Sequence, residues 1–167
     1  MTKRLAVLES DNIEIIDAIK DYFSGKEVEV CVTKEVLDDF DLAVLTGFET
    51  NLKNVVPCNV LNIHPSLLPS FKGENAIQET FLAGVKVSGV TVHCVGADNF
   101  YGRILAQYPV LIGNTTHIDE FNLEILAVAK KLYPVVIDSV LNDKVFDFSD
   151  LFKNSCSGNC GGCGNCH

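Results

Sequence analysis

The chain has no long hydrophobic run and little positive charge. No window of the sequence approaches the roughly 18 consecutive apolar residues of a membrane-spanning helix. The apolar run Leu5–Leu8 is interrupted at Glu9 and is too short for a signal peptide, so we expect a cytoplasmic protein. The 13 Lys and Arg residues face 22 Asp and Glu, which gives a formal net charge of −9. Such a surface repels phosphate backbones and anionic membranes, and nucleic acid is therefore disfavoured as the main partner.

The length and composition predict one globular domain followed by a short tail. The 167 residues suit a single domain, and 47% of them are hydrophobic, which is enough to fill one core. The apolar pattern ends near Phe152, and the residues after it are rich in Gly and contain no large apolar side chain. We therefore divide the chain into a globular domain at residues 1–152 and a Gly- and Cys-rich tail at residues 153–167.

Short apolar runs and helical patterns alternate along the domain. Residues 3–8 predict a buried strand, and residues 12–23 predict a helix with Ser10 or Asp11 as its N-cap. The same reasoning predicts strands at residues 28–32, 42–45, 60–63, 88–95 and 104–112, and helices at residues 76–83 and 116–141. This order predicts an α/β fold, an open and mostly parallel twisted sheet with flanking helices.

Asn62 and His64 are the first candidates for a functional site. They are two residues apart at the end of a predicted strand, so their side chains point to the same side of the sheet. Ligands of open parallel sheets bind at the carboxyl ends of the strands. There an asparagine amide can donate to a developing oxyanion, and a histidine can exchange a proton. The alternative for this pair taken by itself is a structural histidine beside a cap-forming asparagine.

The string around this pair resembles a known family. LNIHPSLLPSFKG at residues 61–73 is similar to the signature of the formyltransferases that include glycinamide ribonucleotide formyltransferase and methionyl-tRNA formyltransferase. The similarity covers residues 41–141 and includes VLTGF at 44–48, NAIQ at 75–78, AGVKVSGVTVH at 83–93, ILAQ at 104–107 and YPVVI at 133–137. The resemblance implies a formyltransferase-like, Rossmann-like fold and a role in one-carbon metabolism and purine biosynthesis, with formyltetrahydrofolate as donor.

The resemblance also implies roles for particular residues. Asn62 would hydrogen-bond the formyl oxygen as negative charge develops on it. His64 would stabilise the tetrahedral intermediate or relay a proton. The backbone of two segments would hold the folate ring. The first segment is Thr46, Gly47 and Phe48, and the second begins with Val95, Gly96 and Ala97.

One catalytic position of the family is changed. The family places an aspartate seven residues after the strand histidine, here His93, and this chain has Phe100 at that place. A phenylalanine neither exchanges a proton nor tunes the pKa of a histidine. Asp98 lies two residues earlier, and it is either a catalytic replacement in a re-registered loop or a solvated turn residue.

The loop after the first strand also differs from the family. The family enzyme that uses glycinamide ribonucleotide has a Gly-rich turn here, whose backbone amides bind the substrate phosphate. This chain has Glu9-Ser10-Asp11-Asn12, with two acids and no glycine, and Thr50 replaces the family's arginine. Only eight residues lie between Val32 and Asp41, so we expect one element of the family's first half to be missing. These changes predict a different formyl acceptor, or none.

Four of the seven cysteines lie in the tail, at Cys156, Cys160, Cys163 and Cys166. Two or three residues separate successive cysteines, and glycines between them permit tight turns, so the thiolates can converge on one metal. Zinc and an iron–sulfur cluster suit four thiolates equally, and a disordered thiol-rich tail is the alternative. The other three cysteines lie in apolar contexts and are expected to be buried; these are Cys31, Cys58 and Cys94.

Three hypotheses follow for the function. The first is an enzyme that passes the formyl group of a reduced folate to an amine acceptor or releases it by hydrolysis. The second is a non-catalytic folate-binding or regulatory protein whose tail senses a metal or a redox state. In the third the tail docks onto a partner enzyme or a second copy of the chain, or transfers electrons. The intact Asn62 and His64 favour the enzyme, because a binding protein has little physical need for both groups.

Overall fold

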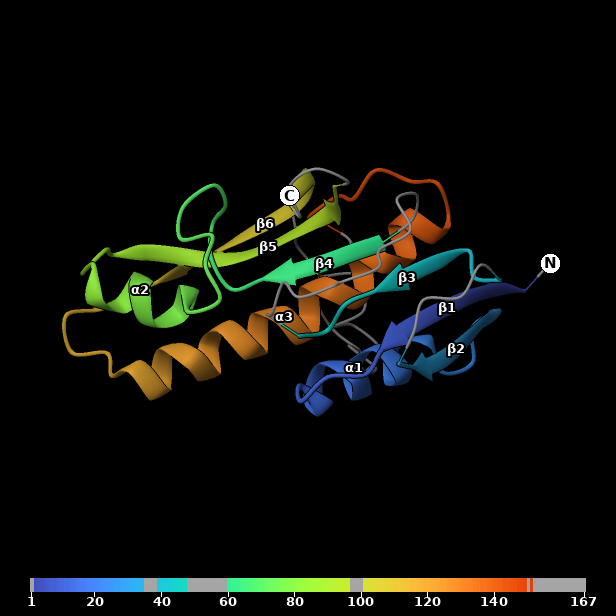
Figure 1. Ribbon diagram of the computed structural model, residues 1–167, viewed down its shortest axis with the longest axis horizontal. Helices are drawn as coiled ribbons and strands as arrows, with labels where there is room; N and C mark the ends of the chain where they lie inside the picture. Colours follow the sequence, from blue (N-terminus) through green and yellow to red (C-terminus); the bar gives the residue numbers. More distant parts are fainter. Residues whose placement is uncertain (1, 35–38, 48–59, 97–100, 150, 152–167) are drawn as a thin grey trace, which may run out of the picture.

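The computed structural model describes residues 2–34, 39–47, 60–96, 101–149 and 151 (Figure 1). Its elements agree closely with those expected from the sequence, and they are, in chain order, β1 (Lys3–Leu8), α1 (Ile13–Phe23), β2 (Val28–Thr33), β3 (Leu42–Val44), β4 (Val60–His64), α2 (Ala76–Leu82), β5 (Val87–Val95), β6 (Tyr101–Leu111) and α3 (Ile118–Leu141). The expected N-cap of α1 was wrong. Asn12 occupies that position, because the Ser10 hydroxyl instead accepts the backbone N–H of Asn12 at 3.2 Å, ahead of the helix. Among the described helices, none has the length and apolar character that a membrane span needs.

The described strands form one sheet in the order β2-β1-β3-β4-β5-β6. The four strands β1 to β4 pair in parallel, β5 pairs antiparallel with β4, and β6 pairs antiparallel with β5. This confirms the predicted α/β class with a mostly parallel sheet. The chain leaves β1 through α1 toward β2, whereas β3 lies on the other side of β1 (Figure 1). The strand order therefore reverses between β1 and β3, which is where ligands bind in open α/β sheets.

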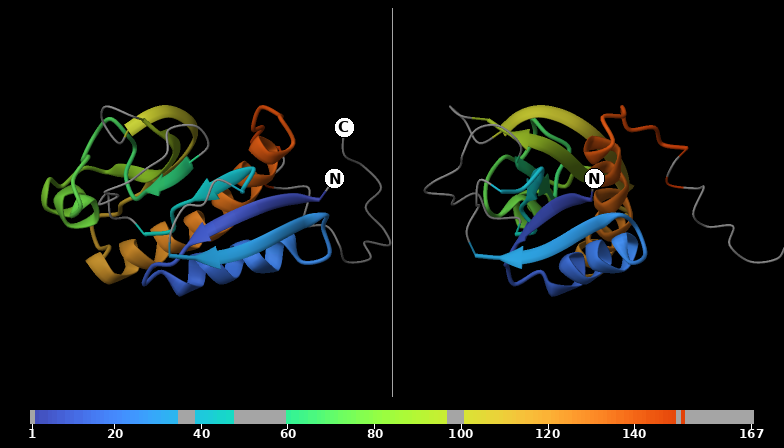
Figure 2. Two further views of the ribbon diagram at one scale, coloured as in Figure 1. Left: turned by 45° about the vertical axis from the view of Figure 1, so that its right-hand side comes forward. Right: turned by 90° about the vertical axis from the view of Figure 1, so that its right-hand side faces the viewer.

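The helices α1 and α3 cover one face of the sheet (Figure 2). Every second residue of the central strands packs into the core on this face, including Leu5, Val7, Leu61, Ile63, Val90 and Val92. Because successive residues of a strand point to opposite faces, Asn62 and His64 on β4 point away from α1 and α3. The same holds for Thr91 and His93 on β5. The fold thus separates an apolar face under the helices from a face that carries the polar residues.

Tyr133 ties α3 to the end of β3 and to the first half of β4. Its side chain is fully buried, and its hydroxyl donates to the carbonyl oxygens of Leu45 at 2.9 Å and Leu61 at 3.1 Å. Burial raises the pKa of Tyr133 well above its ordinary value, so the hydroxyl keeps its proton as a donor. The helix continues through Pro134, as expected from the sequence. This anchor fixes the backbone directly before Thr46 and Asn62.

Candidate active site

Asn62 lies at the centre of a buried polar cluster. Strands β4 and β5 are in a register that places Asn62 directly opposite His93, and both side chains are fully buried. Asn62 Nδ2 lies 3.5 Å from His93 Nε2, a long hydrogen bond. His93 Nδ1 donates to the carbonyl of Cys94 at 2.9 Å, so Nε2 of the neutral ring is the acceptor. Asn62 Oδ1 is buried with no hydrogen-bond partner in the described part of the chain, so this oxygen can accept from a ligand.

His64 has one nitrogen bonded and the other available. Its Nε2 donates to the backbone carbonyl of Phe71 at 2.8 Å. A carbonyl only accepts, so the neutral ring carries its proton on Nε2 and its lone pair on Nδ1. Nδ1 is buried and has no partner among the described residues. The orientation of His64 therefore suits it to take a proton from a reacting group through Nδ1.

The loop after β4 holds His64 in this orientation. After His64 the backbone runs through bends and turns as far as the start of α2. Leu68 donates its backbone N–H to the Thr91 hydroxyl at 3.1 Å, and Gln107 donates to the Leu68 carbonyl at 2.9 Å. These bonds from β5 and β6 anchor the loop, because they satisfy backbone groups that the loop does not pair by itself. They position the carbonyl of Phe71 against His64.

Tyr101, the first residue of β6, completes the cluster. Its ring centroid lies 5.5 Å from that of His64, edge to face, and 5.5 Å from that of His93. Its hydroxyl donates to the backbone carbonyl of Lys72 in the loop after β4. Burial and, less strongly, the negative charge of Glu74 raise the pKa of Tyr101, so the phenol stays protonated. Tyr101 thus packs over both imidazoles and bonds to the loop that orients one of them.

The sequence reasoning did not single out His93 or Tyr101 as site residues. His93 belongs to the string at residues 83–93 that resembles the family, but only the pairing of β4 with β5 brings it to Asn62. Tyr101 directly follows Phe100, the position at which the resemblance implies an aspartate. Phe100 and Asp98 both lie outside the described residues, so the role of Asp98 as a catalytic replacement stays a prediction.

Burial lowers the pKa of both histidines below its ordinary value of 6.5. For His64 the hydrogen bond to Phe71 acts in the opposite direction but is the smaller effect. For His93 the bond to Cys94 raises the pKa, and a charge on His64 would lower it further. Both rings are therefore neutral near pH 7, which is the form in which His64 can act as a base.

Acidification below pH 6.5 is expected to destabilise the fold. In this range the unfolded chain takes up protons on these two histidines while the folded chain does not. The free energy of unfolding therefore decreases as the pH is lowered. The fall should level off below the lowered folded-state pKa values. Urea unfolding between about pH 7.5 and pH 5.5 measures this decrease in the free energy of unfolding. The range lies above the pH at which most carboxylates titrate. The double variant His64→Gln, His93→Gln should show a shallower fall, and an unchanged slope would contradict the expectation.

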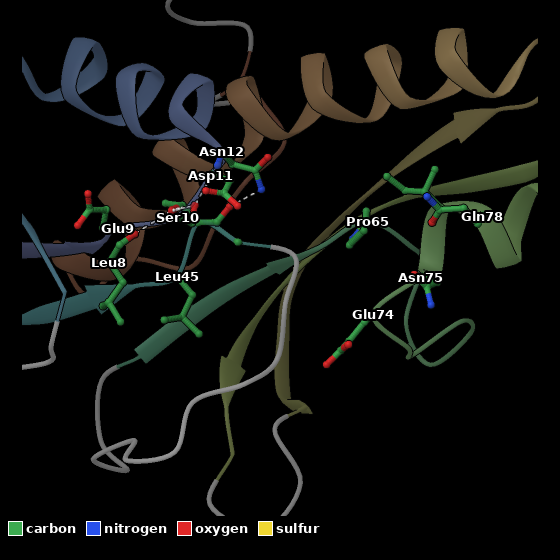
Figure 3. Close-up of a pocket in the computed structure, with 13 residues that line it drawn as sticks. Leu8, Glu9, Ser10, Asp11, Asn12, Leu45, Pro65, Glu74, Asn75 and Gln78 are labelled. Atoms are coloured by element: carbon green, nitrogen blue, oxygen red, sulfur yellow. Dashed lines mark hydrogen bonds between the residues drawn. The ribbon is translucent and has the colours of Figure 1, made fainter.

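A cavity of about 490 Å³ opens at the carboxyl ends of β1, β3 and β4 (Figure 3). Its described lining comes from the loop after β1 (Leu8, Glu9, Ser10, Asp11, Asn12), the end of β3 (Leu45, Thr46, Gly47), Pro65, and the start of α2 (Glu74, Asn75, Ile77, Gln78). It therefore spans the reversal of strand order between β1 and β3. Pro65 directly follows His64, and Glu74 acts on Tyr101, so the cavity adjoins the polar cluster.

The residues expected to hold the folate are only partly described. Thr46 and Gly47 line the cavity, but the Thr46 hydroxyl is already engaged, since it donates to the Leu8 carbonyl at 2.9 Å and contacts the Ser10 hydroxyl at 2.8 Å. Val95 is buried and pairs with Tyr101 in the sheet, and Gly96 follows it. Phe48 and Ala97 lie outside the described residues. Folate binding at these positions stays a prediction.

The predicted metal site is not part of the described structure. Within residues 2–34, 39–47, 60–96, 101–149 and 151, no group of three or more His, Cys, Asp or Glu side chains is arranged to hold a metal. The tail cysteines and the boundary between residues 152 and 153 lie outside these ranges; the cysteines are Cys156, Cys160, Cys163 and Cys166. Cys31 and Cys94 are half-buried, which corrects the expected full burial. Cys31 lies on an edge strand and Cys94 at a register shift of β5, and Cys58 is not described.

The fold and the site together define an α/β protein with a buried amide–imidazole cluster beside a cavity at the reversal of strand order. A comparison with models of protein families matches residues 38–137 to the formyl transferase family. This match agrees with the resemblance found at residues 41–141. The chain belongs to the formyl transferase family.

Individual relatives support the assignment. The chain is 33% identical over 127 residues to phosphoribosylglycinamide formyltransferase of Bacillus subtilis, which covers 73% of this chain and 65% of the relative. It is 38% identical over 117 residues to the trifunctional purine biosynthetic protein adenosine-3 of Bos taurus, covering 66% of this chain and 12% of the relative. The chain thus spans less than two thirds of these relatives. The crystal structure of phosphoribosylglycinamide formyltransferase from Anaplasma phagocytophilum superposes with a TM-score of 0.71 at 26% identity, covering 86% of this chain and 88% of that one.

Proposed function

We propose that this protein transfers the formyl group of formyltetrahydrofolate to a small amine. The observation that carries the proposal is the pair Asn62 and His64, buried beside the cavity with Oδ1 and Nδ1 unpartnered among the described residues. Burying polar atoms without partners costs free energy, and a site that needs them for a reacting group accounts for that cost. Membership of the formyl transferase family supports the type of chemistry and the folate donor.

In the proposed reaction the amine nitrogen attacks the formyl carbon and forms a C–N bond. Negative charge develops on the formyl oxygen, and a hydrogen of Asn62 Nδ2 that is not shared with His93 is donated to it. His64 Nδ1 takes a proton from the attacking nitrogen, which has become positively charged. When the bond between the formyl carbon and the folate nitrogen breaks, the same proton is delivered to that nitrogen. The products are the formylated amine and tetrahydrofolate.

The described surroundings of His64 suit it to this role. The bond to Phe71 fixes which nitrogen carries the proton, and burial keeps the ring neutral near pH 7. A base must be unprotonated before the reaction, and the lowered pKa ensures this. Tyr101 packs against the ring and limits its rotation. We propose that this arrangement replaces the orienting function of the family's aspartate.

The test measures consumption of formyltetrahydrofolate by the full chain purified without oxygen. It is run alone, with glycinamide ribonucleotide, and with a simple primary amine such as ethanolamine. We expect amine-dependent turnover that falls at least about a hundredfold in His64→Ala, since proton-transfer groups contribute about 10²–10⁴ in rate. His117→Ala is the matched control, because His117 is exposed at the start of α3, away from the cluster, and this change should leave turnover unaltered.

Other outcomes separate the competing hypotheses. Turnover that needs His64 but no amine would make the protein a formyl hydrolase, with water as the acceptor. Folate binding without turnover in any condition would contradict the proposed transfer and favour a folate-binding or regulatory protein. Turnover that is unaffected by His64→Ala would remove His64 from the mechanism.

A further inference from the structure

His93 is fully buried in the polar cluster, but it takes no part in the proposed reaction. It lies on β5 directly opposite Asn62 on β4, and opposite residues of an antiparallel pair place their side chains on the same face of the sheet. Within the described part of the chain, His93 is the hydrogen-bond partner of the Asn62 side chain. The structure thus connects His93 to the group that is proposed as the oxyanion donor.

The backbone of β5 decides which nitrogen of His93 carries the proton. Nδ1 lies 2.9 Å from the carbonyl oxygen of Cys94, and a carbonyl only accepts, so Nδ1 is the donor. Burial lowers the pKa of His93, so the ring carries a single proton near pH 7. The other nitrogen, Nε2, therefore presents a lone pair to Asn62 and can only accept a hydrogen bond.

The sheet is irregular on both sides of His93. The register of β5 against β6 shifts between Val92 and His93 and again between His93 and Val95. Irregularities of this kind re-aim side chains and are frequent beside active sites. A Cβ atom at Gly102 on β6 would lie 2.6 Å from the Cys94 carbonyl oxygen, so glycine lets β6 pass close to the carbonyl that His93 uses. The local backbone thus leaves room for the acceptor of the His93 proton.

An acceptor at His93 Nε2 fixes the direction of the Asn62 amide. An amide side chain carries two donor hydrogens on its nitrogen and an acceptor oxygen, and its two ends differ little in shape. Because Nε2 only accepts, Asn62 Nδ2 faces it, and the reversed amide would set Oδ1 against a lone pair. Oδ1 is then left buried with no partner within the described residues. The reacting groups therefore meet one N–H donor and one oxygen acceptor in a defined arrangement.

We propose that His93 is a positioning residue, which holds the Asn62 amide with its nitrogen toward the formyl oxygen and its oxygen open to a hydrogen of the attacking amine. The inference rests on the proposed function, because it assigns to His93 the orientation of the donor in that same site. In the reversed orientation the negative charge that develops on the formyl oxygen would meet the acceptor Oδ1 instead of a donor. In this role His93 touches neither reactant.

Nitrogen NMR of the full chain, isotopically labelled at histidine, tests this orientation without any reaction. The chemical shift of an imidazole nitrogen distinguishes a protonated nitrogen from a bare one, and the signals of His93 are those missing from the variant His93→Gln. We expect Nδ1 to be protonated and Nε2 to be bare at about pH 7.5. A proton on Nε2 would overturn the inference, because this nitrogen would then donate to Oδ1 and reverse the amide.

Two substitutions separate the acceptor of His93 from the shape of its ring. Gln places its Oε1 as many bonds from the backbone as Nε2 of His, so His93→Gln keeps an acceptor there, whereas His93→Leu removes it. We expect His93→Leu to lower kcat for formyl transfer about ten- to a hundredfold and to leave the Kd for formyltetrahydrofolate within about threefold. His93→Gln should keep at least about a third of the wild-type kcat. Equal losses of kcat in the two variants would overturn the inference.

A double variant tests whether His93 acts through Asn62. Adding His93→Leu to Asn62→Ala should lower kcat less than about twofold further, because the group that His93 positions is already gone. Losses that multiply would overturn the inference. Val90→Ala is the matched control for stability, since Val90 is fully buried on the same strand but packs into the core on the opposite face. It should lower the free energy of unfolding and leave kcat within about twofold.

The outcomes distinguish this inference from the proposed function. Formyl transfer that needs His64, together with a proton on His93 Nε2, would overturn the inference and keep the function. Absence of turnover with every amine, together with a proton on His93 Nδ1, would overturn the proposed transfer and keep the orientation of the Asn62 amide.

Discussion

Replacing Asn62 by alanine is expected to lower kcat for formyl transfer about 10²–10³-fold, the usual effect of removing one oxyanion donor. The Asn62 amide is the only described donor side chain on β4 that faces both His93 and the proposed reacting group. Its contribution arises as charge builds on the formyl oxygen, so the loss should fall on kcat. The Kd for formyltetrahydrofolate should stay within about threefold of the wild-type value. Steady-state kinetics combined with equilibrium folate binding separates the two effects.

The Asn62→Ala variant also loses a buried hydrogen bond to His93, so its folding must be checked. Leaving one buried acceptor unsatisfied costs about 1–3 kcal/mol, which urea unfolding detects. Asn122→Ala is the matched control, because Asn122 is exposed on α3 and its replacement should change neither kcat nor stability by much. A folded Asn62→Ala protein that keeps more than about a tenth of the wild-type kcat would exclude the amide as the oxyanion donor.

Replacing Gly89 by alanine is expected to cost at least about 3 kcal/mol of folding free energy. A Cβ atom at Gly89 on β5 would lie 2.0 Å from the carbonyl oxygen of Tyr108 on β6 and 2.9 Å from a methyl group of Leu67. The first contact is with backbone that is held in the sheet, since Gly89 pairs with Pro109. The two strands must therefore separate, and these strands carry His93 and Tyr101. Thermal or urea unfolding of the full chain measures the loss.

Gly113→Ala provides the comparison for this prediction. The nearest atom to a Cβ there is the Thr116 hydroxyl oxygen at 3.1 Å, the end of a side chain that can move, and the site lies after β6 at the surface. Its free energy of unfolding should change by less than about 1 kcal/mol. If Gly89→Ala unfolds at the same denaturant concentration as Gly113→Ala, the close approach of β5 and β6 at Gly89 does not hold in solution.

The sequence was sufficient for the elements and for the centre of the site. Strands such as β1 and β4 are short apolar runs, and α1 and α3 repeat apolar residues at helical spacing, so burial of one face dictates their type. The positions of Asn62 and His64 on one face of β4 follow from the alternation of a strand. The family follows from the string at residues 61–73, because so long a match has little chance of arising otherwise. The expected N-cap of α1 was wrong, since contacts of Ser10 and Asn12 with Thr46, which is distant in the sequence, hold the turn before the helix.

Only the tertiary structure decided which other groups meet Asn62 and His64. The register of β4 against β5 brings His93 to Asn62, and the pairing of β6 brings Tyr101 over both imidazoles. Register depends on cross-strand packing along the whole sheet, which no local pattern encodes. The protonation of each imidazole ring likewise follows from carbonyl partners at Phe71 and Cys94 that the fold places.

The acidic cavity shows the same division. Its residues can be read from the sequence as two acids in the loop after β1 and a third before α2, and the excess of acids over bases is plain from the composition. That these segments, more than sixty residues apart, line one space follows from the reversal of strand order between β1 and β3. Sequence thus determined the charge of this protein's site, because charge belongs to residue type. The tertiary structure decided where the charge acts, because position depends on contacts between distant parts of the chain.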